Sequence, residues 1–165
     1  MIRNMKSCCI ICNRKIDDLK KYEIRNKLIY LIENFNISIF NFGFYGEFND
    51  LCYELLVELK NRYSKIKLVL FSLNNEIAYT FDEVDRVKKK PFSNKCFDEI
   101  IYLEDVDETK FKYACVLRNK KLVDESDFCF IYYKESYSLP NNRNSGTKIA
   151  FEYAKKQNKF IVLYN

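Results

Sequence analysis

Histidine is absent from this 165-residue sequence, and glycine occurs only three times and proline only twice. Without histidine, the Ser–His and Cys–His nucleophile pairs used by many hydrolases are excluded. Zinc is also disfavoured, because the metal-type pair Cys9-x-x-Cys12 has neither a second pair nor a histidine to complete a site. We interpret these two cysteines as small apolar residues at the end of a strand, and we expect no metal.

Long apolar runs are lacking as well. No run approaches the roughly 18 residues that span a membrane, and the N-terminus, Met1-Ile-Arg-Asn-Met-Lys6, has no small-residue cleavage site. The seven cysteines are odd in number and spread through predicted strands and helices, which favours reduced, buried thiols over a disulfide framework. These features predict a cytoplasmic protein without membrane contact.

The chain length predicts a single domain, residues 1–165, and 48% apolar with 31% charged residues is typical of a globular protein. Apolar runs without a helical period predict strands, and amphipathic segments between them predict helices. The predicted strands are Ser7–Ile11, Ile37–Phe42, Ile66–Leu73, the short edge strand Glu99–Leu103, Asp127–Tyr133 and Phe160–Tyr164. This alternation predicts an α/β fold, a three-layer Rossmann-like domain with a mainly parallel sheet of about five strands.

Four helices are expected between these strands. The first begins after Asp17 and Asp18 and carries an apolar stripe that ends at Phe35, and the second runs from the glycine loop to about Tyr63. The third covers Thr109–Val123. In the last, Ile149, Phe151, Tyr153 and Ala154 are expected to surround the buried side. Residues 74–98 form a long polar segment, typical of a lid or a mobile wall.

Two of the three glycines, Gly43 and Gly46, lie between the strand Ile37–Phe42 and the helix that follows it. We expect them to supply positive φ and a close approach to a ligand. A strand–loop–helix unit also directs the free N–H groups of the helix start at an anion. An ordinary turn between strand and helix explains the same residues equally well.

Three loops are expected at the carboxyl edge of the predicted sheet, where ligands of such sheets bind. They are Cys12–Lys15, Gly43–Asn49 and Asn144–Thr147. Arg14 suits a phosphate, and Ser145-Gly146-Thr147 suits a phosphate at a helix start. A surface arginine and a plain N-cap are the simpler interpretations.

Other candidates at this edge are aromatic or polar. Phe44 and Tyr45 suit stacking on a base, unless they only pack on the next helix. Arg118 and Asn119 suit contact with the same edge, unless they form an exposed helical pair.

The order of these motifs resembles the SLOG superfamily, the Rossmann-like nucleotide-binding domains related to the Lonely Guy phosphoribohydrolases. The resemblance spans nearly the whole chain, is closest to small stand-alone bacterial and phage members, and is carried by five stretches. They are Cys12-Asn-Arg14, Phe42-Gly-x-x-Gly-Glu-Phe-Asn-Asp-Leu-Cys52, Leu117-Arg-Asn119 before Asp124-x-Ser-Asp127, Ser145-Gly-Thr147 and Tyr153-Ala-Lys-Lys156.

The resemblance implies a pocket for a nucleotide or a nucleotide-derived molecule, a ligand rather than a cofactor. The implied ligand-binding residues are Cys12, Asn13, Arg14, Gly43, Phe44, Tyr45, Gly46, Glu47, Asn49, Arg118, Asn119, Ser145, Gly146 and Thr147. Some of them depart from the family pattern. Cys12-Asn13-Arg14 replaces the usual Gly-His-Arg, and Phe44 and Asn49 replace a small residue and an aspartate, so the ligand is expected to differ.

The enzymes of the family carry a glutamate three residues after the threonine of their Gly-Gly-x-Gly-Thr motif. Here that position is Ala150, and Glu152 is turned about 200° away on a helix. We therefore expect a sensor or sequestering protein for an NAD- or ADP-ribose-type signal, in keeping with relatives that act in bacteria–phage conflict. A nucleoside-phosphate N-glycosidase that uses Glu47 is the alternative.

Two further expectations concern partners. The resemblance implies a homodimer, since relatives commonly pair. A nucleic-acid or protein interaction module remains the third function class, because the net charge of +5 also suits a polyanion. The densest basic run, Arg86 with Lys88–Lys90, is more typical of a solvated loop, so nucleic acid is the less favoured partner.

Overall fold

The computed structural model describes residues 4–13, 20–43, 46–73, 96–104, 106–107, 110–134 and 145–164. Arg14, Asp17, Asp18, Phe44 and Tyr45 lie outside the described residues, as does most of the polar segment 74–98. Expectations about those residues stay predictions.

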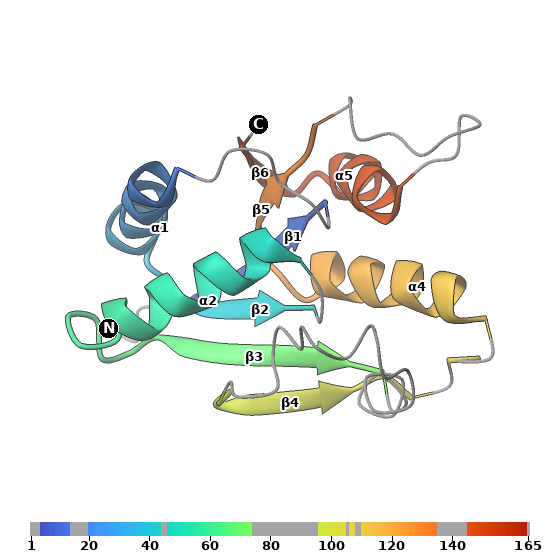
Figure 1. Ribbon diagram of the computed structural model, residues 1–165, viewed down its shortest axis with the longest axis horizontal. Helices are drawn as coiled ribbons and strands as arrows, with labels where there is room; N and C mark the ends of the chain where they lie inside the picture. Colours follow the sequence, from blue (N-terminus) through green and yellow to red (C-terminus); the bar gives the residue numbers. More distant parts are fainter. Residues whose placement is uncertain are drawn as a thin grey trace.

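The fold is a six-stranded, all-parallel sheet with helices on both faces (Figure 1). The elements, in chain order, are β1 (Lys6–Cys12), α1 (Lys21–Phe35), β2 (Ile37–Phe42), α2 (Glu47–Leu59), β3 (Lys67–Ser72), β4 (Glu99–Tyr102), α4 (Phe111–Asp124), β5 (Phe128–Tyr132), α5 (Gly146–Lys156) and β6 (Phe160–Tyr164). The strand order is β4-β3-β2-β1-β5-β6. The predicted Rossmann-like α/β fold is confirmed, with six strands instead of about five.

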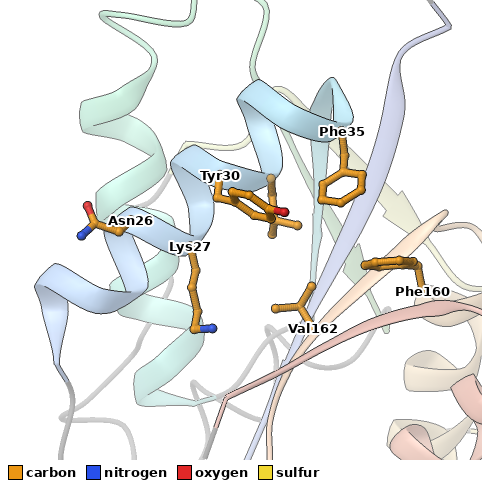
Figure 2. A pocket seen from close by; sticks show the side chains of 7 residues that line it. Asn26, Lys27, Tyr30, Phe35, Phe160 and Val162 are labelled. Carbon is orange, nitrogen blue, oxygen red and sulfur yellow. The ribbon is translucent and has the colours of Figure 1, made fainter.

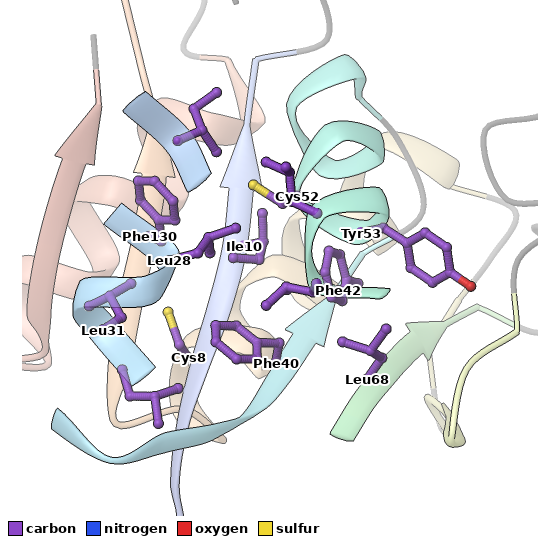
Figure 3. Packing of buried hydrophobic residues seen from close by; sticks show 14 of the residues in the cluster. Cys8, Ile10, Leu28, Leu31, Phe40, Phe42, Cys52, Tyr53, Leu68 and Phe130 are labelled. Atoms are coloured by element: carbon purple, nitrogen blue, oxygen red, sulfur yellow. The ribbon is translucent and has the colours of Figure 1, made fainter. Parts of the chain in front are cut away.

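The sheet separates two hydrophobic clusters because successive side chains of each strand point to opposite faces. On one face, Cys8 and Ile10 of β1 pack with Phe40 and Phe42 of β2 beneath α1 and α2, as Figure 3 shows. On the other face, Cys9 and its neighbours on β1 and β5 pack beneath α4 and α5. Both faces of the central strands are thus buried, which explains why their sequences are continuously apolar.

One prediction about the helices is corrected, and the structure identifies the buried side of α5. The helix α2 ends at Leu59, before the expected end near Tyr63, because residues 60–62 form a turn in which Arg62 N–H donates to the Leu59 carbonyl. In α5 the buried residues are Thr147, Ala150 and Ala154. Small side chains bring this helix close to the sheet, and the bulkier apolar ones, Ile149, Phe151 and Tyr153, lie half-buried along its flanks.

None of the seven cysteines, all of them described, is joined in a disulfide. Cys8, Cys9, Cys52 and Cys129 are buried, whereas Cys96 is exposed. Among the helices in the described part of the chain, none has the length and apolar character needed to cross a bilayer.

Candidate functional site

The candidate site lies where the chain order reverses on the two sides of β1. From β1 the chain moves outward through β2, β3 and β4, and it then returns to the other side of β1 with β5 and β6. Loops at the carboxyl ends of β1 and β5 diverge at such a switch point, and ligands of open α/β sheets bind there. The start of α2 lies beside the arrowhead of β1 in Figure 1.

The glycine loop rests directly on the end of β1. Gly46 has a φ of +127°, a conformation that side-chain-bearing residues rarely adopt. A Cβ at this position would overlap the Cys12 Sγ, and it would also lie 3.5 Å from the Asn13 carbonyl oxygen. The Cys12 thiol in turn donates to Asn49 Oδ1 in the first turn of α2, at 3.6 Å. The end of β1 and the start of α2 are therefore held in direct contact.

The loop after β5 is joined to the end of β1 in the same way. The Thr147 hydroxyl, in the first turn of α5, donates to the Cys12 carbonyl at 2.7 Å. Lys134 N–H donates to Asn13 Oδ1 at 3.3 Å. Asn13, Asn49 and Thr147 are all buried, so their polar groups serve to order the loops against one another.

The middle of α4 completes the circuit. A Cβ at Gly43 would lie 3.3 Å from the Arg118 Nε, and a Cβ at Gly146 would lie 3.7 Å from the Asn119 Nδ2. Arg118 is buried, with 5% of its surface exposed. Contacts therefore run from Cys12 through the glycine loop, α4 and the start of α5 back to Cys12, around one edge of the sheet.

Only one of the two loop glycines needs positive φ. The expectation holds for Gly46 and is wrong for Gly43, because Gly46 is the only described glycine at positive φ. Gly43 is instead a position of close approach, buried against the Arg118 side chain and Leu122.

The two helix starts at this edge differ in charge. The first turn of α2 carries Glu47 and Asp50, whereas the first turn of α5 has no acidic residue and includes Lys148. Burial raises the pKa of the Cys12 thiol to about 12, and the Asp50 and Glu47 carboxylates add to the rise. Cys12 is thus a neutral thiol at physiological pH, and the edge is acidic near α2 and basic near α5.

Ser145 is the N-cap of α5, since its side chain accepts from Lys148 N–H at 3.1 Å. That is the simpler of the two interpretations of this residue. The N–H groups of Gly146 and Thr147 lie in the first turn, where a helix supplies no acceptor of its own. Gly146 is exposed, so an anion can approach these groups.

The structure thus brings together every described residue among the predicted ligand-binding set. Asp50 and Lys148 were not among the residues predicted from the sequence. Asp50 could have been found from its place one turn after Glu47, and Lys148 from its place in the first turn of α5. In the described residues, no group of three or more cysteine, aspartate or glutamate side chains is arranged to hold a metal ion.

The fold and this edge define a Rossmann-like parallel α/β protein. No family model matches the chain, and a search of curated proteins returns no significant match. Among solved structures, a putative aldo-keto reductase from Pseudomonas aeruginosa is similar to 94% of this chain and 72% of its own, with 14% identity and a TM-score of 0.35. A likeness this distant carries no argument about activity.

Proposed function

We propose that this protein binds a nucleotide-derived small molecule at the edge formed by β1, β2 and β5, and that it senses or sequesters this ligand. The observation that carries the proposal is the closed circuit of contacts around the end of β1, in which the start of α5 is exposed at Gly146. The SLOG-type motifs provide three of its parts, the glycine loop, the Arg118-Asn119 pair and the Ser145-Gly146-Thr147 turn.

The unequal charge of the two helix starts supports an orientation for the ligand. A phosphate group fits the start of α5, where main-chain N–H groups and the helix dipole favour an anion. The sugar hydroxyls fit the start of α2, because carboxylates such as Glu47 accept hydrogen bonds from ribose in related sheets. The base is then the part of the ligand on which Phe44 and Tyr45 are predicted from the sequence to stack.

A binding role is favoured over turnover by the position of the carboxylates. Ala150 is buried in α5, and Glu152, two residues further on, is exposed. Neither supplies an acid at the point where the phosphoribohydrolase motif has one. Glu47 is the remaining candidate, and at a helix start it already has a favourable place as a partner of the dipole.

The proposal is tested with Gly146→Asp and its isosteric control Gly146→Asn. The structure leaves room for a Cβ at this position, so both variants should fold. The aspartate should stabilise α5 through the helix dipole while repelling a phosphate, whereas the asparagine adds similar bulk without charge. Thermal melts with nucleoside monophosphates, NAD and ADP-ribose measure binding; a ligand at 100 times its dissociation constant should stabilise the wild type by about 2.7 kcal/mol.

We expect a ligand-dependent rise in melting temperature for the wild type and for Gly146→Asn, and a much smaller rise for Gly146→Asp. Equal binding by the two variants would move the phosphate away from α5. Release of free base during the incubation, abolished by Glu47→Gln, would instead identify an N-glycosidase. No shift with any nucleotide, together with salt-sensitive binding to DNA or RNA, would favour the interaction module.

A further inference from the structure

The last strand of the sheet, β6, has an exposed apolar edge. It is the terminal strand on its side, and its sequence, Phe160-Ile-Val-Leu-Tyr164, contains no charged residue. Phe160 is 52% exposed and Leu163 is 38% exposed. An uncharged, apolar edge strand is a template for pairing with another strand, which natural proteins usually block with charges or proline.

An apolar groove runs beside this strand on the side of α1. Figure 2 shows it between the helix and β6, with Tyr30 and Phe35 of α1 facing Phe160 and Val162. Its volume is about 340 Å³, and Asn26 and Lys27 line its other end. Tyr30 is 55% exposed, so apolar surface continues from the strand edge onto the helix.

The outward-facing backbone groups of β6 can be identified from its pairing with β5. Tyr133 N–H donates to the Tyr164 carbonyl, so the backbone of Tyr164 faces β5. Because these groups alternate in direction along a strand, Val162 and Phe160 face β5 as well, and the N–H and C=O of Ile161 and Leu163 point away from the sheet. Within the described residues no further strand pairs with them, so they form an open hydrogen-bonding edge.

We propose that two copies of this chain associate through β6 strands paired antiparallel about a two-fold axis at Val162, which joins the two sheets into one. In this register Ile161 lies opposite Leu163 of the second copy, and the outward groups of these residues make the reciprocal hydrogen bonds of an antiparallel pair. Phe160 lies opposite Tyr164 of the second copy, so aromatic meets aromatic and aliphatic meets aliphatic.

Three features favour a second copy over a different partner. The order aromatic–aliphatic–Val–aliphatic–aromatic is the same in both directions, which is the self-complementarity that a two-fold interface requires. The groove lies on the same face as Phe160 and Tyr164, so the aromatic side chains of the second copy can cover it. The α1 side chains on this side include both signs of charge, the exposed Glu23 and the half-buried Lys27, so self-association there does not oppose like charges.

The oligomeric state tests this interface. Sedimentation velocity over a wide range of protein concentrations should give the wild type a mass twice the 19.9 kDa of one chain. Leu163→Lys should be monomeric, because lysine on an edge strand blocks pairing. The matched control is Ile100→Lys on β4, the other edge strand, where Ile100 is 45% exposed; it should stay dimeric.

A second variant separates loss of pairing from loss of folding. The N–H of Leu163 points away from β5, so Leu163→Pro removes a donor to the second copy without removing a bond of the sheet. It should be monomeric with a melting curve like that of Leu163→Lys. A monomeric wild type at every concentration, or a Leu163→Pro dimer, would overturn the proposal.

A cross-link tests the register directly. On the axis, the two Val162 residues form a non-hydrogen-bonded pair with Cα atoms about 4.5 Å apart, within the range of a disulfide. In a background where the exposed Cys96 is replaced by serine, Val162→Cys should give a covalent dimer under mild oxidation, linked at residue 162 in peptide maps. Ile161→Cys should not link to itself, since its copies lie more than about 7 Å apart. The opposite result for this pair would exclude the proposed axis.

Discussion

Glycines that look alike in the sequence have different conformational demands in the fold. Gly46 has positive φ and sits against the Cys12 thiol, whereas Gly146 begins α5 without positive φ, and a Cβ there would make only an ordinary contact with Asn119. Gly46→Ala should lower the free energy of unfolding by at least about 1–2 kcal/mol, because both the backbone angle and the overlap with Cys12 oppose a Cβ. Gly146→Ala is the control and should change it by less than about 0.5 kcal/mol. Urea denaturation measures both, and equal losses would contradict the local geometry.

The buried thiols make stability sensitive to alkaline pH. Burial raises the pKa of Cys8, Cys9 and Cys52 well above the ordinary value of 9.0, and that of Cys12 to about 12. From about pH 9 upward the unfolded chain loses protons that the folded chain keeps, so the free energy of unfolding falls as the pH rises. Each such thiol contributes a slope of up to about 1.4 kcal/mol per pH unit.

The prediction is checked by urea titrations between about pH 8 and pH 10.5, where the slope reports the protons released on unfolding. Cys52→Ala should make the decline shallower, even though the variant starts from a lower stability. If Cys52→Ala keeps the slope of the wild type, the buried thiols are not its source.

At the scale of elements, one hydrogen bond holds α5 to β1. Thr147→Val keeps the shape of this buried side chain but leaves the Cys12 carbonyl without the hydroxyl that donates to it at 2.7 Å. We expect a loss of about 1–2 kcal/mol in unfolding free energy, with Thr147→Ser, which keeps the hydroxyl, losing less. If the ligand binds at the start of α5, Thr147→Val should also weaken nucleotide-induced stabilisation, because the helix start would no longer be fixed against β1.

The sequence predicted the elements well where the core alone determines them. The strand Ile37–Phe42 has the bounds that its apolar run predicted, because a central strand is buried on both faces and its pattern is unambiguous. For α5 the sequence predicted the residues around the buried side but not the two that face the sheet with Ala154, which are Thr147 and Ala150; Phe151 stacks on Tyr133 at the flank. A periodic hydrophobic pattern predicts that the most apolar side chains of a helix are buried. Where a helix packs closely on a sheet, small side chains are buried instead.

The candidate site was predictable to a similar extent. That the glycine loop and Thr147 lie at one edge followed from parallel topology, which needs only the order of elements. For Arg118, topology left open the alternative of an exposed position on its helix. The roles of individual residues did not follow. Asn13 and Asn49, expected to contact a ligand, accept hydrogen bonds from within the protein, because a buried polar group must be satisfied by its nearest neighbours.

At the scale of the whole molecule, the described helices on the two faces of the sheet differ in charge. The helices α1 and α2 together carry six acidic and three basic residues, whereas α4 and α5 carry two acidic and seven basic residues. One helix layer is therefore net negative and the other net positive. Neither the total charge of +5 nor the order of residues along the chain reveals this, because the fold alone assigns helices to faces.

This polarity gives the proposed dimer a distinctive response to salt. Pairing of β6 about an axis perpendicular to the sheet places α1 beside α1 and α5 beside α5 of the second copy. The helix α1 carries three basic and two acidic residues, whereas α5 carries three basic residues and one acidic residue, so the repulsion is between the two copies of α5. Added salt screens this repulsion, with a Debye length of about 10 Å at 0.1 M, and should tighten the dimer. Sedimentation in rising NaCl measures the dissociation constant, which we expect to fall. Docking of the basic layer of one copy onto the acidic layer of another would show the opposite trend, because salt would then screen an attraction.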